Sequence, residues 1–147
     1  MRRLAGILVA IGLAVGLPGT ANATTSATSG LVKCSVTALA PTLSGGKLTG
    51  WATVTCNKVT SLEVVLGVVE LDGSNEDARV PIRAVSQSVK VTAPLVNKAI
   101  KVSTGTVTCL DTDANEREEY ASKAMLNLYG PTSPWDRFAP SANQFSC

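Results

Sequence analysis

The side chains of this chain can form disulfides and hold cations, but they lack the group on which most proton-transfer chemistry depends. There is no His among the 147 residues. Ser-His-Asp and Cys-His arrangements are therefore excluded, because no other side chain titrates unperturbed between pH 5 and 8. Glu63, Glu70 or the glutamates of residues 116–119 could serve in a glycosidase-like carboxylate pair, but such enzymes need a deep cleft that a small domain has little room to build. We expect a protein that is not an enzyme and needs no cofactor.

Two stretches collect oxygen ligands of the kind that Ca²⁺ prefers, residues 72–77 and 111–119. Within the second, Asp111, Asp113 and Asn115 have the spacing that begins an EF-hand loop. The match fails at position six, where Glu116 replaces Gly, and at position twelve, where Ser122 replaces the bidentate Glu. We expect solvated loops and no metal site, with Asp111, Asp113 and Asn115 as the calcium alternative.

A binding loop is predicted near the C-terminus, where Trp135, Arg137 and Phe138 lie among prolines 131, 134 and 140. Trp, Arg and a second aromatic residue on a stiff loop are typical of surfaces that contact proteins or carbohydrates. The alternative is that Trp135 and Phe138 cap a core that is poor in aromatic residues. Trp51 presents a similar choice, since it faces outward unless a bulge at Gly50 turns it inward.

The first 23 residues have the order of a secretory signal peptide. Arg2 and Arg3 precede an uncharged run over residues 4–17, and the small residues Ala21, Asn22 and Ala23 follow. A helix of 14 residues would cover about 21 Å, short of the roughly 30 Å of a bilayer core, so the run is not a membrane anchor. We expect cleavage after Ala23 and a secreted, extracellular product.

The mature chain of 124 residues, the 147 less the leader, is predicted to be a single domain of balanced charge. Of the 13 basic residues, two lie in the leader, so 11 remain against 11 acidic ones. Without a basic cluster in the sequence we expect no binding to nucleic acid, and no membrane association after the leader is removed. Residues 24–30 are predicted to be a flexible segment and residues 31–147 the folded domain.

The fold is predicted to be all-β, because apolar residues alternate along short runs rich in Val and Thr. The expected strands cover residues 31–40, 47–56, 62–71, 78–84, 88–92, 99–109, 120–129 and 144–147. Residues 41–46 supply the turn of a first hairpin, and Pro81 assigns its strand to a sheet edge. The run over residues 120–129 has helix-forming residues too, but its alternation favours a strand. About seven or eight antiparallel strands indicate an immunoglobulin-like β-sandwich, with a small antiparallel barrel as the alternative.

The four cysteines, Cys34, Cys56, Cys109 and Cys147, predict two disulfides, since the chain has no Cys-x-x-Cys pair with which to hold zinc. If the first hairpin turns at Gly45, residues whose numbers sum to 90 lie opposite each other, which pairs Cys34 with Cys56. Cys109 then pairs with Cys147. The rival pairing is a bond between sheets from Cys56 to Cys109, leaving Cys34 for Cys147.

The leader, the Thr/Ser-rich stretch after it, the Pro-Thr-Leu-Ser-Gly-Gly turn (residues 41–46) and the Thr-Val-Thr-Cys strand end (residues 106–109) together resemble small secreted immunoglobulin-like proteins of actinobacteria. The resemblance implies an extracellular location and carries no motif with a known activity. We expect a non-catalytic binding module whose partner is an extracellular protein or carbohydrate. The alternative is a secreted inhibitor of an extracellular hydrolase.

Overall fold

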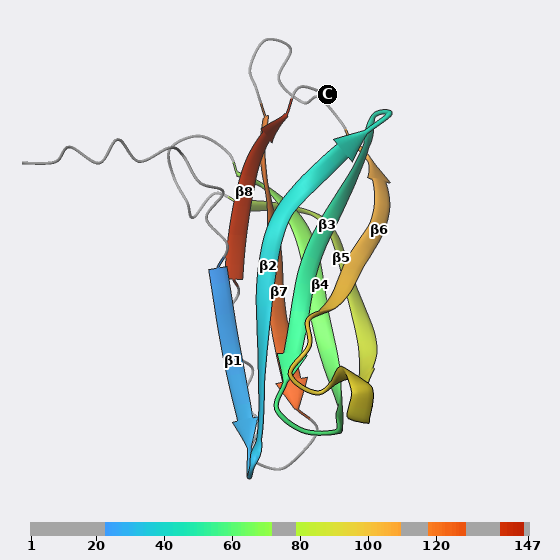
Figure 1. The fold of residues 1–147 in the computed structure, drawn as a ribbon. Coiled ribbons are helices and arrows are strands. Elements are labelled where there is room, and N and C mark those ends of the chain that lie inside the picture. The colour runs from blue at the N-terminus through green and yellow to red at the C-terminus, as the bar shows by residue number, and fades with distance from the viewer. Residues whose placement is uncertain (1–22, 72–78, 110–117, 129–138, 146–147) are drawn as a thin grey trace, which may run out of the picture.

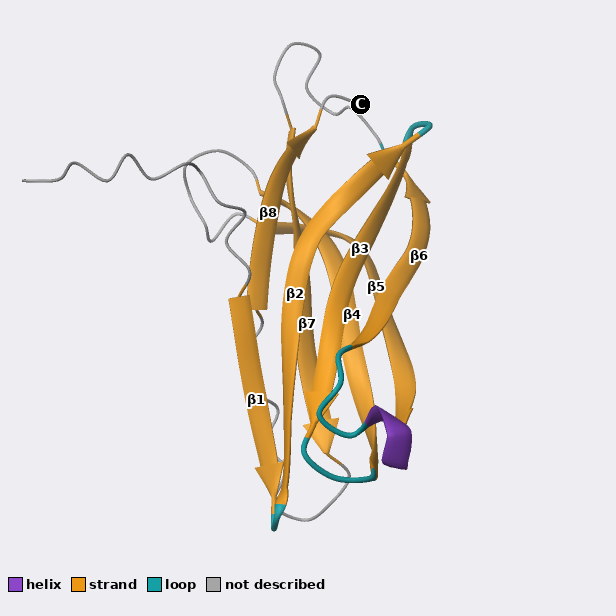
Figure 2. Cartoon of the chain, viewed as in Figure 1, coloured by secondary structure: helices purple, strands orange, loops and turns teal. Residues whose placement is uncertain are grey.

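The computed structural model of this chain describes residues 23–71, 79–109, 118–128 and 139–145, which form two antiparallel sheets packed face to face (Figures 1 and 2). The strands are β1 (Ala23–Ser29), β2 (Val32–Ser44), β3 (Lys47–Cys56), β4 (Thr60–Leu71), β5 (Arg79–Val91), β6 (Ile100–Thr108), β7 (Glu118–Leu128) and β8 (Ala139–Phe145). Within these ranges the one helical element is the 3-10 turn η1 (Ala93–Leu95). The prediction of an all-β protein is confirmed.

The first sheet has the strand order β1-β2-β3-β6 and the second has the order β5-β4-β7-β8. No strand of one sheet pairs with a strand of the other among the described residues. The arrangement is therefore an open sandwich, and the barrel alternative is wrong. β4, the most continuously apolar run, lies inside the second sheet between β5 and β7, as its sequence predicts.

The main core fills the space between the sheets with inward-facing residues of β1 to β7. Its buried side chains include Val36, Val54, Leu62, Val64 and Leu126, all fully shielded from solvent. A smaller buried cluster of Leu48, Val68 and Tyr120 lies at the end of the sandwich that carries the β2–β3 turn. Alternation of β-branched and polar residues places these apolar side chains on the inner faces, which is why short Val-rich strands specify this fold.

The β2–β3 hairpin has the predicted register from the cysteines to Leu39, but its turn differs from the predicted one. Cys34 lies opposite Cys56 and Val36 opposite Val54, as expected for a turn at Gly45. The register then shifts between Leu39 and Thr42, so Ser44 pairs with Lys47 across a two-residue turn. Pro41, which has no N–H to donate, lies in this bulge. The turn residues Gly45 and Gly46 have φ of 56° and 69°, the positive values that such a turn requires.

Residues 24–30, expected to have no regular structure, instead form strand β1 and its turn against the edge of β2. Thr25 and Ala27 are buried while Thr24, Ser26 and Thr28 are exposed. The reason is that Thr is a good strand residue, and the period-two burial was hidden by the uniform polarity of the segment. The ordered domain therefore begins before Leu31.

The second sheet confirms the predicted edge strand and the predicted strand in place of a helix. β5 lies at the edge of the sheet, with a register shift beside Pro81, and unites the two runs expected at residues 78–84 and 88–92. β7 is extended throughout. β8 begins at Ala139, earlier than the expected start at residue 144.

Candidate functional site

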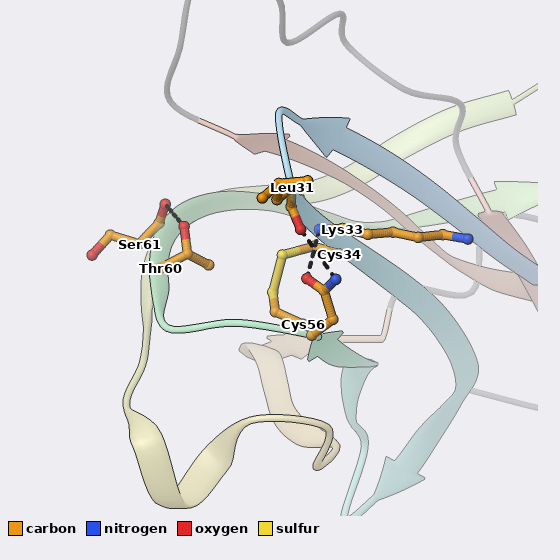
Figure 3. Close-up of a disulfide and its surroundings, with 7 residues drawn as sticks. Leu31, Lys33, Cys34, Cys56, Thr60 and Ser61 are labelled. Atoms are coloured by element: carbon orange, nitrogen blue, oxygen red, sulfur yellow. Dashed lines mark hydrogen bonds between the residues drawn. A yellow bond between two sulfur atoms is a disulfide. The ribbon is translucent and has the colours of Figure 1, made fainter.

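One end of the sandwich is held together by the disulfide Cys34–Cys56, which joins directly opposed residues of β2 and β3 (Figure 3). The two Cα atoms are 4.1 Å apart and both side chains are fully buried. The predicted first pairing is confirmed, and the rival bond from Cys56 to Cys109 is excluded. Cys147 lies outside the described residues, so the pairing of Cys109 with Cys147 stays a prediction.

Asn57, the residue after this disulfide, ties the β3–β4 loop to the β1–β2 turn. Its backbone N–H donates to the Lys33 carbonyl at 3.0 Å, and its side-chain oxygen accepts from the Lys33 N–H at 2.7 Å. Its side-chain NH₂ donates to the Leu31 carbonyl at 3.2 Å. Three hydrogen bonds and a covalent bond thus fix two neighbouring loops against each other.

The loop that carries η1, between β5 and β6, is fastened to the same place. The Asn97 N–H donates to the carbonyl of Cys56 at 2.8 Å, and Asn97 has a φ of 59°, a value that Asn tolerates better than most residues. Within the loop, the Leu95 N–H donates to the Thr92 carbonyl and the Lys98 N–H to the Leu95 carbonyl. Three loops far apart in the sequence therefore meet at one end, which we call the loop end: residues 29–33, 56–61 and 90–99.

Each of these three loops exposes a large apolar side chain. Leu31, Val59 and Leu95 are 78%, 59% and 37% exposed, and they are the large apolar side chains most open to solvent in the described ranges. Scattered exposed apolar residues are ordinary, but three gathered on adjacent loops form the kind of patch that marks an interaction surface. None of the three belongs to the core.

The loop end is also basic. Lys33, Lys58, Lys90 and Lys98 all lie on its three loops or the adjoining strand ends, and all four are exposed. The nearest acidic residue in the described part of the chain is Glu63, farther along β4, whose carboxylate accepts a hydrogen bond from the Ser86 hydroxyl. Folding brings these four lysines, separated in sequence, to one end of the sandwich, with Lys33 on β2 of the first sheet and Lys90 on β5 of the second.

Trp51 faces outward from the first sheet, the first of the two alternatives left open by the sequence. It is half-buried beside Leu39, its partner on β2. Its indole N–H donates to the Thr42 hydroxyl at 2.8 Å, and Lys101 Nζ lies 4.0 Å from the ring centroid. Because its polar group and one face of its ring are already engaged, Trp51 stabilises the sheet surface rather than presenting an open aromatic platform.

A bulge beside Trp51 is held by two buried hydroxyl groups. The Gly50 N–H donates to Thr104 Oγ1 at 2.9 Å, and the Trp51 N–H donates across the sandwich to Ser122 Oγ at 3.2 Å. A Cβ at position 50 would lie 2.5 Å from a methyl carbon of Val68, so only glycine fits. The bulge thus satisfies its freed backbone donors with side chains of β6 and β7.

The other residues singled out from the sequence lie outside the described residues. They are the binding-loop residues Trp135, Arg137 and Phe138 and the calcium candidates Asp111, Asp113 and Asn115. In the described ranges no group of three or more His, Cys, Asp or Glu side chains could hold a metal ion. Nor do those ranges contain a helix with the length and apolar character needed to cross a bilayer.

The loop end was missed in the sequence because its exposed apolar residues are separated by up to 64 positions, from Leu31 to Leu95. One local signal existed. Leu31 directly follows Gly30, and a large apolar residue is unusual at a hairpin turn. No protein-family model, curated protein or solved structure matches this chain.

Proposed function

We propose that this protein is an exported, non-catalytic binding module that attaches to its partner through the loop end. The observation that supports this proposal is that Leu31, Val59 and Leu95 are exposed on three loops of one end. A disulfide and hydrogen bonds join these loops. Loops fixed on a rigid sheet scaffold are where binding residues are commonly placed. The leader supports export, and a buried disulfide accords with an oxidising compartment.

We further propose that the sandwich is immunoglobulin-like. Taking β2, β3, β4, β5, β6, β7 and β8 as strands A, B, C, C′, E, F and G, the observed neighbours are A-B-E in one sheet and C′-C-F-G in the other. Immunoglobulin domains share the neighbours A-B-E and C-F-G, and variable domains add C′ beside C. The additional strand β1 lies beside β2. The disulfide differs, since it joins A to B rather than B to F. Loops cluster at the two ends of such domains, and binding by one loop end is a recurrent use of them.

The inhibitor alternative rests on the proline-stiffened segment around Trp135, which lies outside the described residues. It has a direct test, because a hydrolase inhibitor reduces enzyme activity at micromolar concentration. Incubation with a panel of secreted proteases and amylases distinguishes it from a module that only binds. Absence of inhibition leaves the binding module as the surviving proposal.

The proposed function is tested by binding of the labelled mature protein to envelope fractions of the cells that produce it. The variant L31S/V59T/L95Q removes the apolar patch, and we expect it to lose at least tenfold in binding. The matched control is Lys47→Gln, a substitution of an exposed residue in the hairpin at the opposite end. We expect it to bind like the wild type. Equal binding by the wild type and the triple variant would contradict the proposal.

A further inference from the structure

Leu31 occupies a position where folding gains nothing from an apolar side chain. Ser29 pairs with Val32, so Gly30 and Leu31 form a two-residue hairpin turn, with Gly30 at a φ of 57°. Turns of this kind favour Gly, Asn, Asp and Ser, whose side chains are small or polar. Val59 is 59% exposed and Leu95 is 37% exposed, and neither belongs to a buried core cluster. Exposed apolar side chains on three loops of one end are what contact with an external apolar surface would require.

The charges of the two ends differ. At the loop end the described charges are the four lysines, with Glu63 farther up the strand. At the hairpin end both signs occur, since Lys47 and Arg79 lie at strand ends there, as do Glu70, Glu118 and Glu119. Among the residues that the structure describes, the loop end is therefore the more positive of the two ends.

From these observations we infer that the loop end binds the surface of an anionic phospholipid bilayer, with Leu31, Val59 and Leu95 in the interface and the four lysines among the headgroups. The inference rests on the proposed function and names the partner. It departs from the sequence-based expectation of no membrane association, which assumed that the lysines stay scattered.

A bilayer fits this end better than a soluble polyanion does. A polyanion would use the lysines and leave the apolar side chains in water, whereas a bilayer interface accepts both. Peripheral attachment generally needs two weak signals together, an apolar insertion and a basic patch, and the loop end supplies both. The disulfide and the bonds from Asn57 and Asn97 fix the loops beforehand, so little ordering entropy is lost on contact.

The test is cosedimentation of the mature protein with large unilamellar vesicles of phosphatidylcholine alone or with 30% phosphatidylglycerol, at roughly 0.05 M and 0.5 M salt, where screening differs strongly. We expect binding only to the anionic vesicles, with at least a tenfold weaker partition at high salt. Each lysine near an anionic surface contributes about fivefold, so K58Q should bind about fivefold less well than the wild type. The matched control K47Q, which removes the same charge at the hairpin end, should change binding by less than twofold.

The apolar contribution is tested with L31S/V59T/L95Q, which keeps every lysine. We expect at least a tenfold loss on the same anionic vesicles, with an unchanged melting curve showing that the variant is folded. Inorganic polyphosphate, added as a competitor, should displace only a small part of the vesicle-bound wild-type or K58Q protein.

Three results would overturn the inference. One is polyphosphate binding that the triple apolar variant retains, which would assign the lysines to a soluble polyanion. Another is self-association of the wild type, lost in the triple variant and measured by analytical ultracentrifugation, which would assign the patch to a second copy of the chain. The third is no vesicle binding while envelope binding still depends on the loop end, which would leave the proposed function standing with a different partner.

Discussion

The two ends of this sandwich are built from the same strands and differ in almost every other respect. At the hairpin end, Gly45 and Gly46 make a turn without side chains and Leu48 is buried against Val68 and Tyr120. At the loop end, the disulfide and Asn57 fix the loops, and Leu31 remains exposed. Both ends have buried apolar residues, but the loop end also exposes three large apolar side chains. The loop end is ordered by the disulfide and by hydrogen bonds. Its exposed apolar residues are therefore free to contact a partner.

The hairpin end should be the more sensitive to loss of an apolar side chain. Leu48→Ala removes a fully buried side chain from a small cluster, and we expect a loss of about 3 kcal/mol in the free energy of unfolding. Urea unfolding followed by far-UV circular dichroism measures it. The control is Leu43→Ala, because Leu43 is only half-buried in the same hairpin and should cost less. A loss below about 1 kcal/mol for Leu48→Ala would show that this cluster contributes little to the free energy of unfolding.

The loop end should depend on its disulfide instead. The cysteines of the bond are 22 positions apart, and the chain-entropy model gives about 3 kcal/mol for closing such a loop. We expect C34A/C56A to lose roughly this free energy of unfolding and to bind its partner less well, since the neighbouring loops lose their fixed spacing. Denaturant unfolding and envelope binding of the same preparation test both effects. Unchanged stability would mean that the remaining contacts already fix this end.

Asn57 allows a finer test of how the loops are held. Asn57→Ala removes the side-chain bonds to the Lys33 N–H and the Leu31 carbonyl, for which we expect a loss of about 1 to 2 kcal/mol. Asn57→Asp keeps the acceptor for Lys33 and loses the donor to Leu31, so its loss should be smaller. Hydrogen exchange should show faster exchange of the Lys33 amide in the Ala variant than in the Asp variant. Equal exchange in the two variants would contradict the role of the Asn57 oxygen.

The sequence predicted the parts of the molecule that local patterns determine. Period-two alternation located β2, β3 and β7, a continuous apolar run located β4, and the rule that paired numbers sum to 90 gave the Cys34–Cys56 bond. Pro41 marks where that rule stops, because a bulge allows a two-residue turn at Gly45 and Gly46 that no residue count could foresee. β1 was missed because Thr and Ser occupy both its buried and its exposed positions.

The candidate site could not be predicted in the same way. Val59 and Leu95 appear ordinary in the sequence, and Leu31 is marked only by its place after Gly30. Only the antiparallel topology brings their loops together. The lysines were likewise weighed as a net charge, which hides their placement at one end. The binding loop named from the sequence, at Trp135, Arg137 and Phe138, lies outside the described residues and stays a prediction.

The free energy of unfolding of L31S/V59T/L95Q, measured beside the wild type, tests most directly whether the apolar residues of the loop end serve binding and not folding. Substitutions at exposed positions away from structural features change stability by no more than about 0.5 kcal/mol, so the two urea transitions should coincide within that range. A loss of about 2 kcal/mol or more would show that these side chains contribute to the folded state, and would contradict their assignment to a binding surface.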